Sequence, residues 1–161
     1  MANALNMTMR LKQDPASLAK LAQVKSVFAT KIQVAIDEAL RKSEIVHFAR
    51  VLVIDDRYIQ VITEYDGDPV VYTDFFRLAL PTVFQTIFDL VEDAPPWNEL
   101  NDRDAFFKYT STKNLRALGG DPADARTGYL FSAYGNKTVK QLLMGQGVNQ
   151  NVRTGEVAGA I

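Results

Sequence analysis

Residues 45–67, IVHFARVLVIDDRYIQVITEYDG, contain two runs of β-branched and aromatic residues separated by a short polar stretch. The polar stretch, Asp55-Asp56-Arg57, is typical of a turn, and Asp66-Gly67 ends the second run. Two such runs around a short turn predict an antiparallel β-hairpin. The first strand of this hairpin contains His47, the only histidine of the chain.

The segment before the hairpin predicts one strand followed by a helix. Residues 4–11 alternate between apolar and polar side chains, as a half-buried strand does. Asp14-Pro15 is typical of a helix start, with an N-cap followed by proline in the first turn. No glycine or proline occurs between residues 16 and 65, so we expect one long helix or two abutting helices to lead into the hairpin.

After the hairpin, Asp68-Pro69 repeats the signature of a helix start. The apolar residues that follow keep helical spacing straight through Pro81. Proline removes one backbone hydrogen bond and clashes with the preceding turn. We therefore predict one helix from about residue 69 to 91, kinked near residues 77–80.

The remaining sequence predicts a helix at 102–115, a fourth strand at 128–134 (GYLFSAY) and a last short helix capped by Asn136. Without the extra helices, the order is βαββαβ, the arrangement of the ferredoxin-like fold. The predicted fold class is therefore α+β, with a ferredoxin-like sheet and additional helices.

A ferredoxin-like sheet has helices on one face, and its other face needs a cover. A second copy of the same sheet is the simplest cover, so we expect a homodimer that pairs into an α+β barrel. We assign residues 1–143 to the ferredoxin-like domain. Residues 144–161 form a C-terminal tail, which we expect a partner subunit to order.

Four segments carry a resemblance to a known family. They are VHFAR (46–50), EYDGD (64–68), YTDFF (72–76) and LFSAYG (130–135). With these motifs, residues 4–143 resemble the dimeric α+β-barrel superfamily, and within it a set of small bacterial proteins with HFAR and YDG strands. The resemblance implies two ferredoxin-like sheets packed face to face around a cavity. The superfamily includes cofactor-free monooxygenases, haem-binding enzymes and plain binding proteins, so the resemblance does not select one activity.

Composition excludes several classes of protein. The chain has 161 residues, a net charge of −1 and no cysteine, which gives no electrostatic case for nucleic acid and no disulfide framework. It has no signal-peptide or membrane-spanning pattern, so we expect a cytoplasmic protein with no membrane partner. A single strand histidine without cysteine does not match a haem ligand or a metal triad, so we expect neither a cofactor nor a metal.

The candidate site residues depend on the register of the hairpin. A loop of two or four residues places His47 opposite Asp66, on one face with Gln60 and Glu64. A three-residue loop instead groups Arg50 with Gln60, Glu64 and Asp66. A glycine in the turn would favour the three-residue loop, and Asp55-Asp56-Arg57 contains none. We therefore favour the first register. Without a bulge, His47 and Arg50 point to opposite faces, and only one of them lines the cavity.

We take His47 and Asp66 as candidate catalytic residues, because a carboxylate that orients an imidazole can assist proton abstraction. Arg50, Gln60 and Glu64 are the candidate ligand-binding residues. The predicted function is the binding or transformation of a small apolar or aromatic molecule in the barrel cavity. The alternative is a non-catalytic interaction dimer with a filled inter-sheet core. The sequence leaves open whether the protein is an enzyme.

Overall fold

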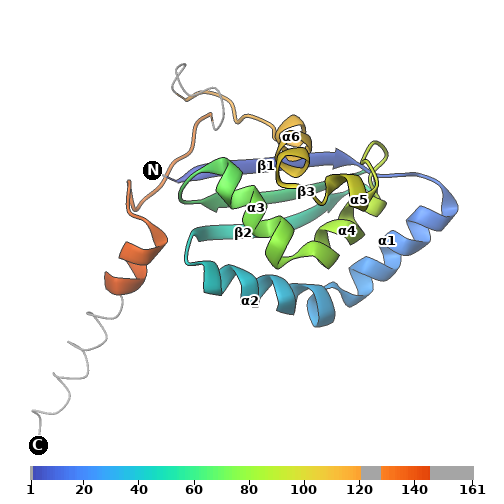
Figure 1. Cartoon of the computed structure of the whole chain (residues 1–161), viewed down its shortest axis with the longest axis horizontal. Coiled ribbons are helices and arrows are strands. Elements are labelled where there is room, and N and C mark those ends of the chain that lie inside the picture. Colours follow the sequence, from blue (N-terminus) through green and yellow to red (C-terminus); the bar gives the residue numbers. More distant parts are fainter. Residues whose placement is uncertain (1, 121–127, 146–161) are drawn as a thin grey trace, which may run out of the picture.

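The computed structural model describes residues 2–120 and 128–145. In this part of the chain, a three-stranded antiparallel sheet in the order β1-β3-β2 is combined with helices, which confirms the predicted α+β class (Figure 1). The strands are β1 (Asn3–Arg10), β2 (Val46–Ile54) and β3 (Tyr58–Tyr65). The helices are α1 (Pro15–Val27), η1 (Phe28–Ile32), α2 (Gln33–Ser43), α3 (Pro69–Ala79), α4 (Pro81–Asp89), α5 (Trp97–Leu100) and α6 (Arg103–Lys113).

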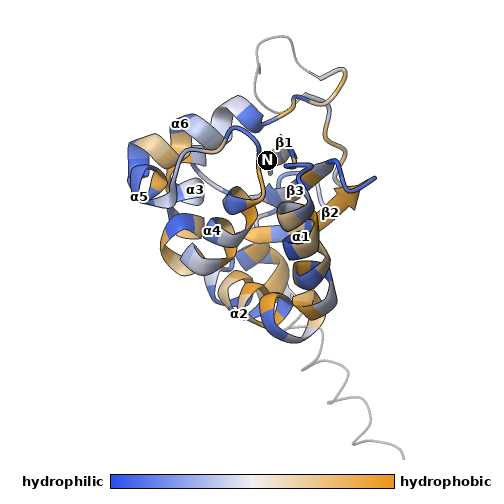
Figure 2. Cartoon of the chain, turned by 90° about the vertical axis from the view of Figure 1, so that its right-hand side faces the viewer, coloured by the Kyte–Doolittle hydropathy of each residue, from blue (hydrophilic) through white to orange (hydrophobic). Residues whose placement is uncertain are grey.

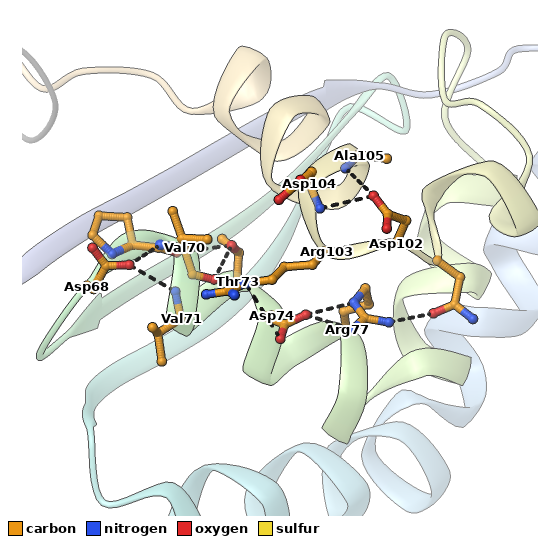
Figure 3. Close-up of polar contacts among 12 residues, drawn as sticks. Asp68, Val70, Val71, Thr73, Asp74, Arg77, Asp102, Arg103, Asp104 and Ala105 are labelled. Carbon is orange, nitrogen blue, oxygen red and sulfur yellow. Dashed lines mark hydrogen bonds and ion pairs between the residues drawn. The ribbon is translucent and has the colours of Figure 1, made fainter.

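Aspartate caps begin three helices where the sequence predicted helix starts. The carboxylates of Asp14, Asp68 and Asp102 each accept hydrogen bonds from backbone N–H groups in the first turn of α1, α3 and α6. Figure 3 shows the caps at Asp68 and Asp102, together with the ion pair of Asp74 and Arg77 on α3 (2.7 Å). Local side-chain chemistry therefore sets these helix starts.

The helical stretch before the hairpin is continuous, as predicted. α1 and α2 are joined by η1, a five-residue π-helical segment. A π-helical turn shifts the phase of the residues that follow it and is frequent at functional sites. Figure 1 shows α1 and α2 running along the β2 side of the sheet, while α3 and α4 cross the sheet.

The prediction of a single kinked helix from 69 to 91 is wrong in one respect, because the helix divides. Leu80 lies between α3 and α4 with φ −130° and ψ 44°, outside the helical region. A residue that precedes proline is driven from the helical region by the proline ring, which explains the break at this position. The buried face nevertheless continues across the break, since Phe76, Leu80 and Phe84 are all buried.

The predicted fourth strand is wrong. Residues 128–134 form no strand, and the order within the described chain is one strand, helices, a hairpin and further helices, rather than βαββαβ. The free edge of β1 is instead occupied by two single bridges, Met7 to Asn114 and Leu11 to Val91. These bridges place the segments after α4 and α6 where a fourth strand would pair.

The last helix begins two residues later than predicted. Residues 139–145 are helical, and Thr138, not Asn136, caps them. The N–H of Thr138 donates to Gln141 Oε1 (2.9 Å), and the N–H of Gln141 donates to Thr138 Oγ1 (3.3 Å). This reciprocal pair is a capping box. Residues 146–161, which include most of the predicted tail, lie outside the described residues.

The hydrophobic core lies between the sheet and the helices. Alternate residues of β1 and β3 face it, and α3, α4 and α6 supply aromatic rings. Its largest members are Met7, Met9, Ile59, Tyr65, Tyr72, Phe76, Phe84, Phe88 and Phe106. The rings of Tyr65 and Tyr72 stack with centroids 3.5 Å apart. No helix of the described residues is both long and apolar enough to cross a bilayer.

Candidate functional site

The hairpin adopts the register that the sequence analysis did not favour. Phe48 pairs with Glu64 and Ile54 pairs with Tyr58, which leaves a three-residue loop. Asp55 and Asp56 both have φ +52°. Aspartate tolerates this left-handed conformation better than most residues, so the turn forms without the glycine that we expected it to need.

A β-bulge at His47 brings this residue to Asp66, the partner expected for it in the other register. Between Val46 and Phe48 the pairing shifts, so that Val46 pairs with Tyr65 and His47 is the extra residue. His47 Nε2 lies 2.9 Å from Asp66 Oδ1, and the two side chains are only 8% and 14% exposed. The predicted His47–Asp66 pair is thus present, although a bulge rather than simple strand alternation brings it together.

Asp66 has a second partner outside the sheet. Its Oδ2 accepts a hydrogen bond of 2.7 Å from the N–H of Val139, in the first turn of the helix at 139–145. A carboxylate is stabilised at a helix N-terminus because it pairs with free N–H groups and with the helix dipole. Asp66 therefore ties the end of the hairpin to the C-terminal helix, and it holds the His47 ring by its other oxygen.

The other candidates divide between two places. Arg50 and Glu64 lie with His47 around a hollow of about 390 Å³ that residues 130–134 close from one side. Gln60 lies away from this hollow, because it is four residues, about 13 Å, from Glu64 along β3. Its Nε2 donates to Thr8 Oγ1 (3.0 Å) across to β1. The structure thus groups His47, Arg50 and Glu64, and leaves Gln60 out.

The face of the sheet opposite the core is exposed along the hairpin. Its large apolar side chains are Phe48, Leu52, Ile54 and Tyr58, and Phe48 is 62% exposed. They form a stripe at the β2 edge, which has no neighbouring strand in the described chain. We call this set the open-face stripe. Arg50 lies on the same face, between Phe48 and Leu52. Exposed apolar side chains beside an unpaired strand edge are typical of an interaction surface.

A second hollow, not predicted from the sequence, lies on the core side of the sheet. It has a volume of about 330 Å³ and adjoins another of about 290 Å³, with which it shares Phe28, Val51, Val83 and Ile87. We call the two together the helix-side groove. Its walls come from α1, η1 and α2 on one side and α3 and α4 on the other, and β2 and β3 form its floor. Figure 2 shows hydrophobic residues on the ribbons of α1, α2 and α4.

The groove exists because α2 packs loosely on the sheet. None of the residues of α2 is fully buried, although Ile36 and Leu40 on its apolar side face the groove. On the floor, Ala49 lies directly opposite Thr63. The small side chain of Ala49 leaves space that a larger β-branched residue would fill, so the cavity is set by this one position as well as by the helix.

The floor of the groove contains an unusual polar group. Thr63 is 1% exposed, and its hydroxyl lies beside the buried hydroxyl of Tyr72, with which it interacts. Neither hydroxyl has any other hydrogen-bond partner among the described residues. Burial raises the pKa of the Tyr72 phenol and outweighs the opposite effect of the Thr63 hydroxyl, so this group stays protonated at neutral pH. Two hydroxyls that can pair only with each other leave one donor unused, which is unusual for buried groups.

Strand alternation in the sequence is enough to indicate the floor of the groove. In β3, a threonine at a position that alternates with Ile59, Val61 and Tyr65 predicts a buried hydroxyl, and Ala49 opposite it predicts free volume. The packing of α2, which turns that volume into a groove, had no local signal. The same holds for the contact of Asp66 with Val139, which joins residues 73 positions apart.

No group of three metal-binding side chains converges anywhere in residues 2–120 and 128–145. Comparison of the chain with protein-family models, with curated proteins and with solved structures gives no match. The resemblance to dimeric α+β-barrel proteins thus rests on its four motifs. The structure supports it at the level of an α+β fold with a three-stranded antiparallel sheet.

Proposed function

We propose that this protein is a homodimer that binds a small, largely apolar or aromatic molecule. The observation that carries the proposal is the helix-side groove. The volume of about 330 Å³ of its larger hollow, its mainly apolar walls and its few polar groups match the usual character of small-molecule sites. No reaction is part of the proposal, because His47 and Asp66 lie at the other side of the hairpin from this groove.

The open-face stripe supports the dimeric part of the proposal. Two copies that meet through this face would cover Phe48, Leu52 and Ile54 and would enclose the barrel cavity expected from the resemblance. Arg50 and Glu64 would then lie at the edge of that cavity, where they could bind polar parts of a ligand. The cavity between sheets is thus a second place for a ligand, whereas the groove needs only one chain.

Filling the groove is expected to weaken binding. In Ala49→Phe, the new ring points to the core side of the sheet, as Thr63 opposite it does, and occupies the groove. We expect at least a tenfold weaker affinity for the fluorescent probe 1-anilinonaphthalene-8-sulfonate, measured by titration. The matched control is Ala133→Phe, which places the same ring in the hollow around His47 and Arg50. A weaker affinity in the control alone would locate the site in that hollow and contradict the assignment to the groove.

A charge on the open face is expected to separate the dimer. Leu52→Lys should give a monomer at micromolar concentration in sedimentation velocity, because a stable interface above about 1,000 Å² excludes an unpaired charge from its centre. Val34→Lys is the matched control, since Val34 is 60% exposed on α2 and away from the sheet. A monomeric wild type would contradict the dimer.

The alternative, a non-catalytic interaction dimer with a filled inter-sheet core, predicts a different pair of results. In that case the wild type sediments as a dimer but does not bind the fluorescent probe. The two measurements together therefore separate the small-molecule protein from the interaction protein.

A further inference from the structure

We propose that the molecule bound in the helix-side groove carries one neutral hydrogen-bonding group, a hydroxyl or a carbonyl, which pairs with the Thr63 hydroxyl at the floor. The inference rests on the proposed function and names the class of ligand: an uncharged apolar or aromatic alcohol, phenol, ketone or aldehyde. It is carried by two neighbouring hydroxyls, those of Thr63 and Tyr72, which the fold buries without any further hydrogen-bond partner.

The position of Thr63 makes its hydroxyl available to a ligand. Thr63 is in the central strand, between Leu5 of β1 and Ala49 of β2, and its side chain lines the groove. Both strand neighbours are aliphatic, so the Tyr72 hydroxyl is the one group that interacts with it. A buried donor that lacks an acceptor costs free energy, so a ligand that supplies the acceptor gains affinity relative to an analogue without that group.

The surroundings of Thr63 indicate a neutral rather than a charged group. The side chains around the floor of the groove are Val51, Val61, Phe76 and Leu80, and none of them carries charge. Two charged residues lie at the rim of the groove. Asp37 is already paired with Arg41 (2.8 Å), and Arg50, which pairs with Ile62, directs its side chain to the face of the sheet opposite Thr63. Burial of an ionised carboxylate or amine beside Thr63 would lack a counter-charge, which strongly opposes its binding.

Tyr72 adds a second neutral donor near the same place. Its phenol is buried and protonated, and its hydroxyl interacts with that of Thr63 but has no other hydrogen-bond partner in the described part of the chain. Two hydroxyls that pair with each other use only one of their two protons, so the Thr63 hydroxyl can accept from Tyr72 and still donate to a ligand carbonyl or hydroxyl. Either ligand group therefore completes the hydrogen bonding of this buried pair.

The test compares two probes that differ by one hydroxyl, naphthalene and 2-naphthol, by isothermal titration calorimetry. We expect the wild type to bind 2-naphthol at least tenfold more tightly than naphthalene. In Thr63→Val, which keeps the shape of the side chain but removes its hydroxyl, this preference should fall to less than threefold, with the affinity for naphthalene unchanged. Thr63→Ser keeps the hydroxyl and should retain the preference.

The other outcomes overturn the inference. Equal affinities for the two probes in the wild type, or a preference that Thr63→Val leaves intact, would show that Thr63 does not recognise the ligand. If the wild type binds 1-anilinonaphthalene-8-sulfonate in the groove but neither probe, the ligand class is wrong while the proposed function stands. If none of the three compounds binds, the proposed function itself fails.

Discussion

Replacement of Phe106 by alanine is expected to lower the free energy of unfolding by about 3–5 kcal/mol, the range for a fully buried aromatic residue. Phe106 is 1% exposed and lies at the centre of the aromatic part of the core. Its ring packs edge-on against Phe84 and Trp97, with centroids 5.5 and 6.2 Å away. Removal of the ring leaves a cavity that these rigid neighbours cannot fill.

Urea denaturation followed by circular dichroism measures this effect, and thermal unfolding should show a fall of roughly 6–20 °C. Phe107→Ala is the matched control, because Phe107 is the next residue on α6 but is only partly buried. We expect a clearly smaller loss for the control. Equal losses for the two variants, or a loss below about 1 kcal/mol for Phe106→Ala, would contradict the assigned core.

Asp66→Ala is expected to release the C-terminal helix and to lower the free energy of unfolding by about 1–3 kcal/mol, because it leaves buried hydrogen-bonding groups without a partner. The carboxylate joins His47 Nε2 to the N–H of Val139, and alanine removes both bonds. Without this tie, the helix at 139–145 should open locally. Lys137 and Lys140 lie at its start, so trypsin cleavage there should become at least tenfold faster.

Asp68→Ala is the control for this variant. Asp68 also accepts two hydrogen bonds from backbone N–H groups, but at the start of α3, away from the C-terminal helix. It should cost about 1 kcal/mol, as the loss of a helix cap does, and leave cleavage at Lys137 unchanged. If Asp66→Ala has no effect on that cleavage, then the tie does not hold the helix, and a catalytic role for His47 and Asp66 becomes the better explanation of the pair.

The His47–Asp66 pair was predicted correctly, although the hairpin register from which it was predicted is wrong. Strand alternation predicted that His47 meets Asp66 only in a register that the hairpin does not adopt. The actual register follows from Asp55 and Asp56, which accept positive φ without glycine. The bulge at His47 then returns its ring to Asp66. Bulges depend on contacts across the sheet and have no reliable pattern in the sequence.

The capping box at Thr138 is a different case, because its signal is present in the sequence. Threonine followed three residues later by glutamine is a local pattern of a helix start. Residue type alone favours Asn136 as the cap. The structure shows that the reciprocal pair with Gln141, and not the type of one residue, sets where this helix begins.

The sequence by itself determined the features that depend on neighbours along the chain. These are the α+β class, the hairpin, the helix starts at Asp14 and Asp68, and a distortion of the helix before Pro81, although not the division into two helices. Each follows from a side chain acting on backbone within a few residues, or from an alternation that only one secondary structure can bury.

Only the tertiary structure decided which segments meet. The edge of β1 is occupied by residues near Asn114 and Val91, so the β-rich stretch at 128–134 finds no edge there to join. The loose packing of α2 over Ala49 opens the groove, and the burial of Thr63 beside Tyr72 leaves these two hydroxyls with no further partner. Competition between distant segments for the same edge or surface is a property of the whole fold, and therefore no local pattern could resolve it.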